Sequence, residues 1–242
     1  MILVVSALAE ELAPLAKRIA GRRRVPAPHG VAASGLEGRL GGVTLRLVAT
    51  GAGHARASSG LRRLLEGDGW CCERMILVGV AGGLDPRLAK GDVVRVGRVL
   101  RLDAAGEIAT APAERRLGGD AGGLALTVDR IVAAASEKES LWRRLGEPRA
   151  AVVDMESFHW VTTLAELAAP PDHTILRAVS DAAEVSLPSF LPHCVGAGGE
   201  ISRARVAARS LTSPSSVPAL LRLRRDVHAA AVRLADAVEG LV

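Results

Sequence analysis

Short apolar segments recur along this chain, and most of them are followed within two residues by a glycine or an acidic residue. Five of these segments have the length and composition of buried strands: Met1–Ser6, Val43–Ala49, Met75–Val80, Ala151–Val153 and Thr174–Val179. Helix-favouring stretches alternate with them: Glu10–Ile19, a segment ending near Leu65, Glu137–Leu145, Glu156–Leu167 and Val217–Val242. This alternation predicts an α/β fold, in which helices cover both faces of a mostly parallel sheet.

The length and the remaining segments define the domain organisation. We expect a further β-rich stretch at Val93–Leu100, and loops over residues 103–123 and 185–199. A chain of 242 residues that is 49% hydrophobic can bury one large core. We therefore predict a single three-layer α/β/α domain over residues 1–242 with a mixed, mostly parallel central sheet. Residues 200–242 are expected to form a C-terminal helical extension of it.

The charge and composition exclude several classes of function. The net charge is +5, but Lys occurs only at positions 17, 90 and 138, and Arg supplies the other cations. Aromatic residues make up only 2% of the chain, so platforms for stacking nucleic-acid bases are scarce. We predict no nucleic-acid partner.

The same composition bears on location and on metals. The apolar stretches fall short of the roughly 18 residues that span a bilayer, and no positively charged segment precedes the first strand. Cys71, Cys72 and Cys194 are an odd number without the spacing of a disulfide framework, which favours the reducing cytoplasm. Neither the cysteines nor the histidines have the spacing of a metal site, so no metal is predicted.

Polar residues and glycines follow the predicted strands. They are Glu10 and Glu11, Gly51–His54, Ala81–Leu84, Asp154–Glu156, and Ser180 with Asp181. In open α/β sheets, ligands bind beyond the carboxyl ends of the strands. We therefore predict one binding site along this rim, with Gly53 and Ser180 among its residues.

Each acid at the rim has a structural and a functional interpretation. Asp181 precedes a segment expected to be helical, so it is either an N-cap or a desolvated general acid. Glu156 is either a first-turn acid favoured by the helix dipole or a carboxylate that binds the vicinal hydroxyls of a sugar. Met155 either fills the core or packs on the apolar face of that sugar. Glu11 is either solvated or orients and deprotonates a water molecule.

The glycines permit tight turns and a close approach of the backbone to a ligand. Gly51 and Gly53 do not make a dinucleotide-binding fingerprint, because Arg56 occupies the position of its third glycine. The chain also lacks the G-x-S-x-G motif of serine hydrolases. No cofactor is predicted.

Five motifs in order along residues 1–190 are similar to those of a known family. They are VVSALAEELAPL, ATGAGHARA, VGVAGGLDPRLAKGDVV, VVDMES and RAVSDAAE. Together they resemble the nucleoside phosphorylase and nucleosidase superfamily, which includes purine nucleoside phosphorylase and methylthioadenosine/S-adenosylhomocysteine nucleosidase. The resemblance implies a phosphorylase/hydrolase-like fold and cleavage of the N-glycosidic bond of a purine nucleoside.

The resemblance also implies roles for individual residues. Asp181 matches the acid that protonates N7 of the purine, Glu156 the glutamate that holds the ribose hydroxyls, and Met155 the methionine beneath the ribose. Glu11 matches the glutamate that activates water in the nucleosidase branch. The turn Ala81-Gly82-Gly83 matches the glycine-rich turn that lines the ribose and anion side.

Water and phosphate are both candidate nucleophiles. In the bacterial phosphorylase branch, an Arg in the first loop and another Arg with a Ser near the glycine-rich turn bind phosphate. Here the first loop is Ala9-Glu10-Glu11, and Val80 precedes Ala81. Acids in that loop would repel phosphate, so we favour hydrolysis, although Arg56 or His54 could hold an anion. Phosphorolysis, with phosphate as co-substrate, and a non-catalytic nucleoside-binding module are the alternatives.

Family members often place an aromatic ring against the purine, and some take part of that wall from a second subunit. This chain has no Tyr, and Phe occurs only at positions 158 and 190. Phe158 either contacts the base or points into the core, while Val153 and Val128 are candidates for an aliphatic base wall. The family's dimers make a homodimer the expectation.

The C-terminal tail resembles that of hopanoid-associated phosphorylase-like proteins, which remove adenine from adenosylhopane. In that subgroup a lipid substrate would be reached at a membrane. Apolar and basic residues alternate in the tail at Leu220, Leu221, Arg222, Leu223, Arg224 and Arg225. This segment is predicted either to make peripheral membrane contact or to be a helix that covers the sheet with its Arg side chains in solvent. The substituent on the ribose 5′ position is left open.

Overall fold

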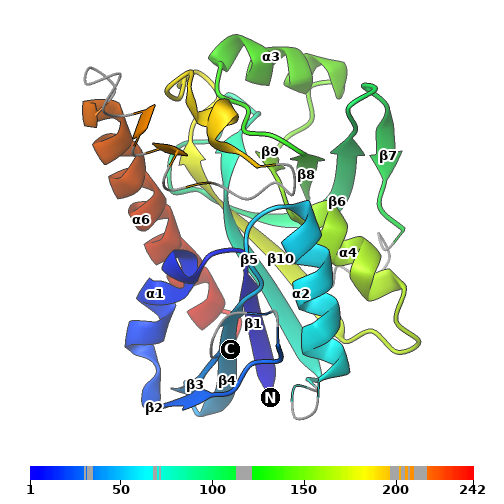
Figure 1. Cartoon of the computed structure of the whole chain (residues 1–242), viewed down its shortest axis with the longest axis vertical. Coiled ribbons are helices and arrows are strands. Elements are labelled where there is room, and N and C mark those ends of the chain that lie inside the picture. Colours follow the sequence, from blue (N-terminus) through cyan, green and yellow to red (C-terminus); the bar gives the residue numbers. More distant parts are fainter. Residues whose placement is uncertain are drawn as a thin grey trace.

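The computed structural model describes residues 1–29, 31, 35–67, 70, 72–112, 122–196, 202, 205–206, 208–209 and 217–242. Its strands are β1 (Ile2–Ser6), β2 (Ala20–Val25), β3 (Gly35–Leu40), β4 (Val43–Ala49), β5 (Arg74–Gly83), β6 (Val93–Leu102), β7 (Ile108–Thr110), β8 (Gly123–Val128), β9 (Ala151–Asp154) and β10 (Asp172–Asp181) (Figure 1). Its helices are α1 (Ala9–Arg18), α2 (His54–Glu66), α3 (Ala135–Arg144), α4 (Ser157–Ala165), the short 3₁₀ helix η1 (Leu191–Cys194) and α6 (Val217–Glu239).

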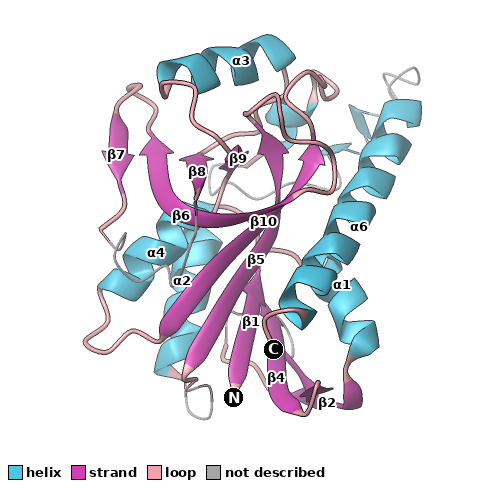
Figure 2. Ribbon diagram, turned by 180° about the vertical axis from the view of Figure 1, so that it is seen from behind, coloured by secondary structure: helices cyan, strands magenta, loops and turns pink. Residues whose placement is uncertain are grey.

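The strands form one mixed sheet with the order β10-β6-β8-β9-β5-β1-β4-β3-β2, and β7 pairs with β6. Strands β4, β1, β5 and β10 are parallel to one another through their shared pairings. Because β10 pairs with both β5 and β6, the strands β5, β10, β6, β8 and β9 close into a circuit. Figure 2 shows β6 curving across the sheet within this circuit.

Helices cover both faces of the sheet, as predicted (Figure 1). Alternate residues of β1 contact opposite layers, as the two-residue period of a strand requires. Leu3 and Val5 join the core beneath α2 and α4, whereas Ile2 and Val4 join the core beneath α1 and α6. A smaller cluster packs α3 on β8 and β9 through Leu141. The protein is thus a single three-layer domain.

The predicted strands and helices are confirmed, with ends that shift by a few residues. The loop predicted over residues 103–123 is wrong in two places: it contains strand β7, and its last residue, Gly123, begins β8. Residues 113–121 lie outside the described chain. The loop predicted over 185–199 contains η1, and its residues 197–199 are outside the described part. The hairpin of β2 and β3 was not predicted.

The expectation that a helix follows Asp181 is wrong. Strand β10 continues through Asp181, which pairs in register with Gly82 of β5 after a bulge between Val179 and Asp181. A turn rather than a helix follows. The N-cap interpretation of Asp181 therefore fails, since no helix begins there.

Helix α6 forms most of the described part of the predicted C-terminal extension, and it packs against α1, β5 and β10. Much of the segment between residues 197 and 216 lies outside the described chain. Of the helices described, none combines the length and the apolar character that crossing a membrane requires. Cys72 and Cys194 are free thiols, and Cys71 is outside the described residues.

Candidate active site

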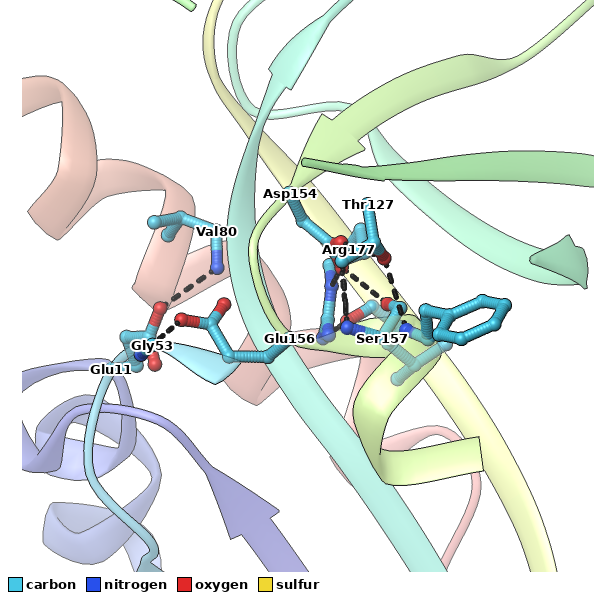
Figure 3. A network of polar contacts seen from close by, with 10 residues as sticks. Glu11, Gly53, Val80, Thr127, Asp154, Glu156, Ser157 and Arg177 are labelled. Carbon is cyan, nitrogen blue, oxygen red and sulfur yellow. Dashed lines mark hydrogen bonds and ion pairs between the residues drawn. The ribbon is translucent and has the colours of Figure 1, made fainter. Parts of the chain in front are cut away.

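The carboxyl end of β5 is the point at which the polar residues of the rim meet. Glu11, in the first turn of α1, is buried and reaches this end (Figure 3). Its Oε1 accepts a hydrogen bond of 3.0 Å from the backbone N–H of Val80, and its Oε2 accepts one of 3.0 Å from the N–H of Leu8. Burial raises the pKa of the Glu11 carboxyl above its usual range.

Glu156 approaches the same place from the loop between β9 and α4. Its Oε1 accepts a hydrogen bond of 3.0 Å from the N–H of Gly53, at the start of α2 (Figure 3). Burial of the carboxyl, reinforced by the negative charge of Asp154, raises the pKa of Glu156 to about 7. Gly53 has a φ of 89°, a left-handed conformation that favours glycine and turns its N–H toward Glu156.

Asp154 is held in a saturated network rather than open to a ligand. Its carboxylate accepts hydrogen bonds from Thr127 Oγ1 at 2.7 Å and from Arg177 Nε at 2.6 Å. Ser157 also donates to it through its backbone N–H and its hydroxyl. The Arg177 guanidinium lies 5.0 Å from the ring centroid of Trp160. Sequence reasoning missed Arg177, although an Arg inside an apolar strand was a usable signal.

Asp181 lies at the end of β10, beside Gly82. Its Oδ1 accepts a hydrogen bond of 2.6 Å from Ser180 Oγ, and its Oδ2 is paired with Lys138 Nζ. Lys138 belongs to the first turns of α3 and was not singled out, because its charged surroundings in SEKESL are typical of a solvated helix face. The structure instead buries it completely.

The glycine-rich turn brings several predicted residues together. A Cβ on Gly82 would lie 3.2 Å from Asp181 Oδ2 and 3.2 Å from Val153 Cγ1, so a side chain here would be tightly crowded. Ser180 Oγ also lies 3.2 Å from the carbonyl oxygen of Ala81. The structure therefore brings Ala81, Gly82, Val153, Ser180 and Asp181 close together.

Phe158 and Met155 are both partly exposed. The Phe158 ring packs against the core cluster beneath α2 and α4, and it meets the ring of His159 edge-on at 5.9 Å. The Arg101 guanidinium lies 6.0 Å from the Phe158 ring. This geometry is compatible with both of the interpretations given to Phe158.

A second polar cluster, not anticipated from the sequence, lies near the start of α2. Asp129 Oδ1 is 3.9 Å from His54 Nδ1 and 3.7 Å from His159 Nε2, while its Oδ2 accepts a hydrogen bond of 2.9 Å from Arg101. Burial, followed by the charge of Arg101, lowers the pKa of His159. Arg56 is exposed, and its side chain packs over Gly51. Within the described residues, no group of His, Cys, Asp and Glu side chains could hold a metal ion.

Comparison with known proteins agrees with this architecture. Residues 1–121 match the profile of the phosphorylase superfamily, which is half of the chain, so the protein belongs to that superfamily. Over a stretch of 58 residues, the chain is 41% identical to the 5′-methylthioadenosine/S-adenosylhomocysteine nucleosidase of Mycobacterium bovis. That match covers 24% of this chain and only 23% of the relative.

Solved structures share the whole fold. The 5′-methylthioadenosine/S-adenosylhomocysteine nucleosidase of Neisseria meningitidis, in complex with methylthio-immucillin-A, superposes with a TM-score of 0.67 at 21% identity, covering 98% of this chain and 96% of the other. The futalosine hydrolase of Helicobacter pylori gives a TM-score of 0.65 at 13% identity, over 98% and 94% of the two chains. At these identities the likeness establishes the fold.

Proposed function

We propose that the protein hydrolyses the N-glycosidic bond of a purine nucleoside. The observation that carries this proposal is the convergence of three carboxyl groups on the end of β5. Glu11 is hydrogen-bonded to Val80, Asp181 is paired in register with Gly82, and Glu156 lies near enough to Glu11 for their charges to interact. Three acids around one strand end suit a reaction that needs a proton donor, a proton acceptor and a stabilised cation.

Each carboxyl has a step that its surroundings support. Asp181 would protonate N7 of the purine, so that the base leaves as a neutral molecule. Glu156 would bind the ribose hydroxyls through the oxygen that Gly53 does not use, and its charge would stabilise the oxocarbenium-like ribose. Glu11 would take a proton from water, because burial raises its pKa toward the working range of a general base.

Water is favoured over phosphate by the charges at this end of the sheet. Glu11 and Glu156 present carboxyl groups where a phosphate dianion would bind. The buried Arg177 already donates through Nε to Asp154 and through Nη1 to the carbonyl oxygen of Leu176, which leaves only its Nη2 without a partner among the described residues. Phosphorolysis remains the second candidate, since Arg56 is exposed near the start of α2.

The relatives suggest adenine as the base, because one solved relative, from Colwellia psychrerythraea, was crystallised with adenine. A small 5′-substituted adenosine is the simplest substrate class. A lipid-linked adenosine is the alternative, supported by the exposure of Leu221 (61%) and Val217 (38%) beside the basic start of α6. We further propose a homodimer in the cytoplasm, with Met155 beneath the ribose and with Val153, Val128 and Phe158 against the base.

The test is adenine release from a panel of 5′-substituted adenosines, including one that is lipid-linked, with and without phosphate. Equal release in both buffers is expected for a nucleosidase. Release that depends strictly on phosphate and yields a ribose 1-phosphate would assign the protein to the phosphorylase branch. Tight nucleoside binding without any release would indicate a non-catalytic module.

A further inference from the structure

Lys138 lies in the first half of α3, and its side chain is completely inaccessible to solvent. An ammonium group has three N–H bonds, and here each has an acceptor. Nζ lies 2.5 Å from Asp181 Oδ2 and 2.9 Å from each of the carbonyl oxygens of Ala182 and Val185. The group is therefore aimed at the Asp181 carboxyl and cannot rotate away without losing a hydrogen bond in a buried environment.

The choice of lysine at this position is informative. Arg supplies all but three of the 31 cationic side chains of this chain. Of the other two lysines, Lys17 is exposed, and Lys90 pairs at the surface with Asp226. Another buried ion pair among the described residues, the one with Asp154, uses Arg177. A guanidinium stays protonated under all working conditions, whereas a buried ammonium can release its proton.

The surroundings hold the Asp181 carboxyl on both oxygens. Ser180 Oγ donates to Oδ1, and Lys138 donates to Oδ2. Gly82 lies beside this pair, where an added Cβ would be 3.2 Å from Oδ2 and 3.7 Å from Lys138 Cε. Glycine at this position therefore keeps space open next to the carboxyl.

We propose that Lys138 is the positioning residue of Asp181 and supplies the proton that Asp181 passes to the leaving purine. The acid of the reaction is then the Lys138–Asp181 pair rather than the carboxyl alone. This inference rests on the function proposed above.

The proton and electron balance of this step is complete. One proton moves from Lys138 Nζ to the Asp181 carboxylate, and one moves from that carboxyl to N7. The bond between C1′ and N9 breaks, and its electron pair stays on the purine, which leaves neutral. A water oxygen bonds to C1′ and gives its proton to Glu11. Once the purine has left, that proton returns through solvent to the Asp181 carboxylate and from there to the neutral amine of Lys138, so one water is consumed and no net charge is created.

A purely structural role for Lys138 predicts a different pattern of variants. If the ammonium only ties the turn after β10 to α3, then Lys138→Arg, which keeps the charge, should be well tolerated, and Lys138→Met should be the damaging change. A proton-supplying role reverses this order. Arg would keep Asp181 ionised but give up no proton. With Met, the buried Asp181 would hold a proton of its own at low pH and could still act as an acid.

The first measurement is the binding of 9-deazaadenine, a base that carries a permanent proton on N7 and needs no turnover. Calorimetric titration should show that Lys138→Arg binds it as the wild type does, because an ionised Asp181 accepts the N7 proton. At low pH, Lys138→Met should bind it at least about 10-fold more weakly, since the carbonyl oxygen of a neutral carboxyl is a weaker acceptor of the N7 proton than a carboxylate. Equal affinity of Lys138→Met and the wild type would overturn the pairing.

The second measurement compares two leaving groups in kinetics. With a purine nucleoside, Lys138→Arg should lower kcat by about 10²–10⁴, the range of general acid catalysis. With 4-nitrophenyl riboside, whose phenolate leaves without a proton, the same variant should lose less than about tenfold. Lys138→Met should keep activity at low pH and lose it as the pH rises. Wild-type turnover by Lys138→Arg, or an unchanged pH profile in Lys138→Met, would refute the inference.

These outcomes are separable from failure of the proposed function. If the wild type releases no purine from any nucleoside, the proposed function fails, yet the 9-deazaadenine titrations still decide whether Lys138 controls the charge on Asp181. If Lys138→Arg unfolds, as judged by its thermal melting, the binding and the pH profile of Lys138→Met decide the question.

Discussion

Two buried ion pairs lie at the same end of the sheet, and they differ in how fully their carboxylates are used. Asp154 accepts hydrogen bonds from Thr127, Ser157 and Arg177, which fills nearly all of the roughly four sites of a carboxylate. Among the described residues, Asp181 accepts hydrogen bonds only from Ser180 and Lys138. Both acids are buried, so burial does not distinguish them. The unused capacity of Asp181 is what suits it to meet a ligand.

The largest effect on activity should come from removing the charge of Asp181, the acid with fewer hydrogen-bond donors around it. Asp181→Asn is expected to lower kcat for purine release by about 10²–10⁴, because the amide cannot deliver a proton to N7. Steady-state kinetics measures this, and circular dichroism shows whether the fold is kept. Full activity in a folded Asp181→Asn protein would remove the contrast between the two pairs.

The saturated pair should instead matter for stability. Asp154→Ala leaves Arg177 buried without its partner, so we expect the free energy of unfolding to fall by about 3–5 kcal/mol. Denaturant titration measures the change, and Asp172→Ala, at the exposed start of β10, is the matched control with an expected change within about 0.5 kcal/mol. An Asp154→Ala protein with an unchanged free energy of unfolding would mean that the network around Asp154 does not stabilise the fold.

The third prediction concerns Glu156, whose pKa is raised by burial and by the neighbouring charge of Asp154. Its pKa is about 7 in the folded protein and near 4.5 when unfolded, so the folded state binds more protons between these values. The free energy of unfolding should therefore decrease as the pH rises from 4.5 to 7, by about 1–3 kcal/mol after allowance for partial exposure.

Glu156→Gln provides the control, because an amide does not titrate. Chemical denaturation at several pH values should show that this slope is missing in the variant, and that the variant is the more stable protein above pH 7. If both proteins keep the same slope over this range, another group is responsible for it.

The smallest effect concerns the space beside Asp181. Gly82→Ala would place a methyl group 3.2 Å from Asp181 Oδ2 and from Val153 Cγ1, which requires shifts of a few tenths of an ångström. We expect a loss of about 1 kcal/mol in stability and a several-fold loss of activity. Gly122→Ala, where an added Cβ meets nothing within 4 Å, is the matched control. Equal behaviour of the two variants would show that the space beside Asp181 is not needed.

Much of this architecture follows from local patterns. Strands β1 and β5 contain continuous apolar runs, as strands buried on both faces require, and β4 alternates polar and apolar residues, so these strands and the polar residues that follow them could be predicted. The edge hairpin of β2 and β3 could not. Arg22, Arg23 and Arg24 of β2 are exposed, and its apolar pattern is absent because it faces solvent.

The partners of the acids were beyond sequence reasoning for a different reason. Lys138 is 43 residues from Asp181 along the chain, and Arg177 is 23 residues from Asp154. Neither pairing produces a periodic sequence pattern, because the two ion pairs depend on how α3 and β9 are placed against β10 in three dimensions. The sequence indicated which acids lie at the rim, while the distinction between a saturated and an available acid needed the tertiary structure.

The closed circuit of strands has a consequence for how the domain opens. Strand β9 has only four residues, and so short a strand at a free edge would fray easily. Here β9 is paired with β5 on one side and β8 on the other, inside a circuit with no free end. Its amide protons should therefore exchange with deuterium as slowly as those of β5. Asp154 and Asp181, at the ends of β9 and β10, should therefore keep their spacing as long as this closed ring of strands stays paired.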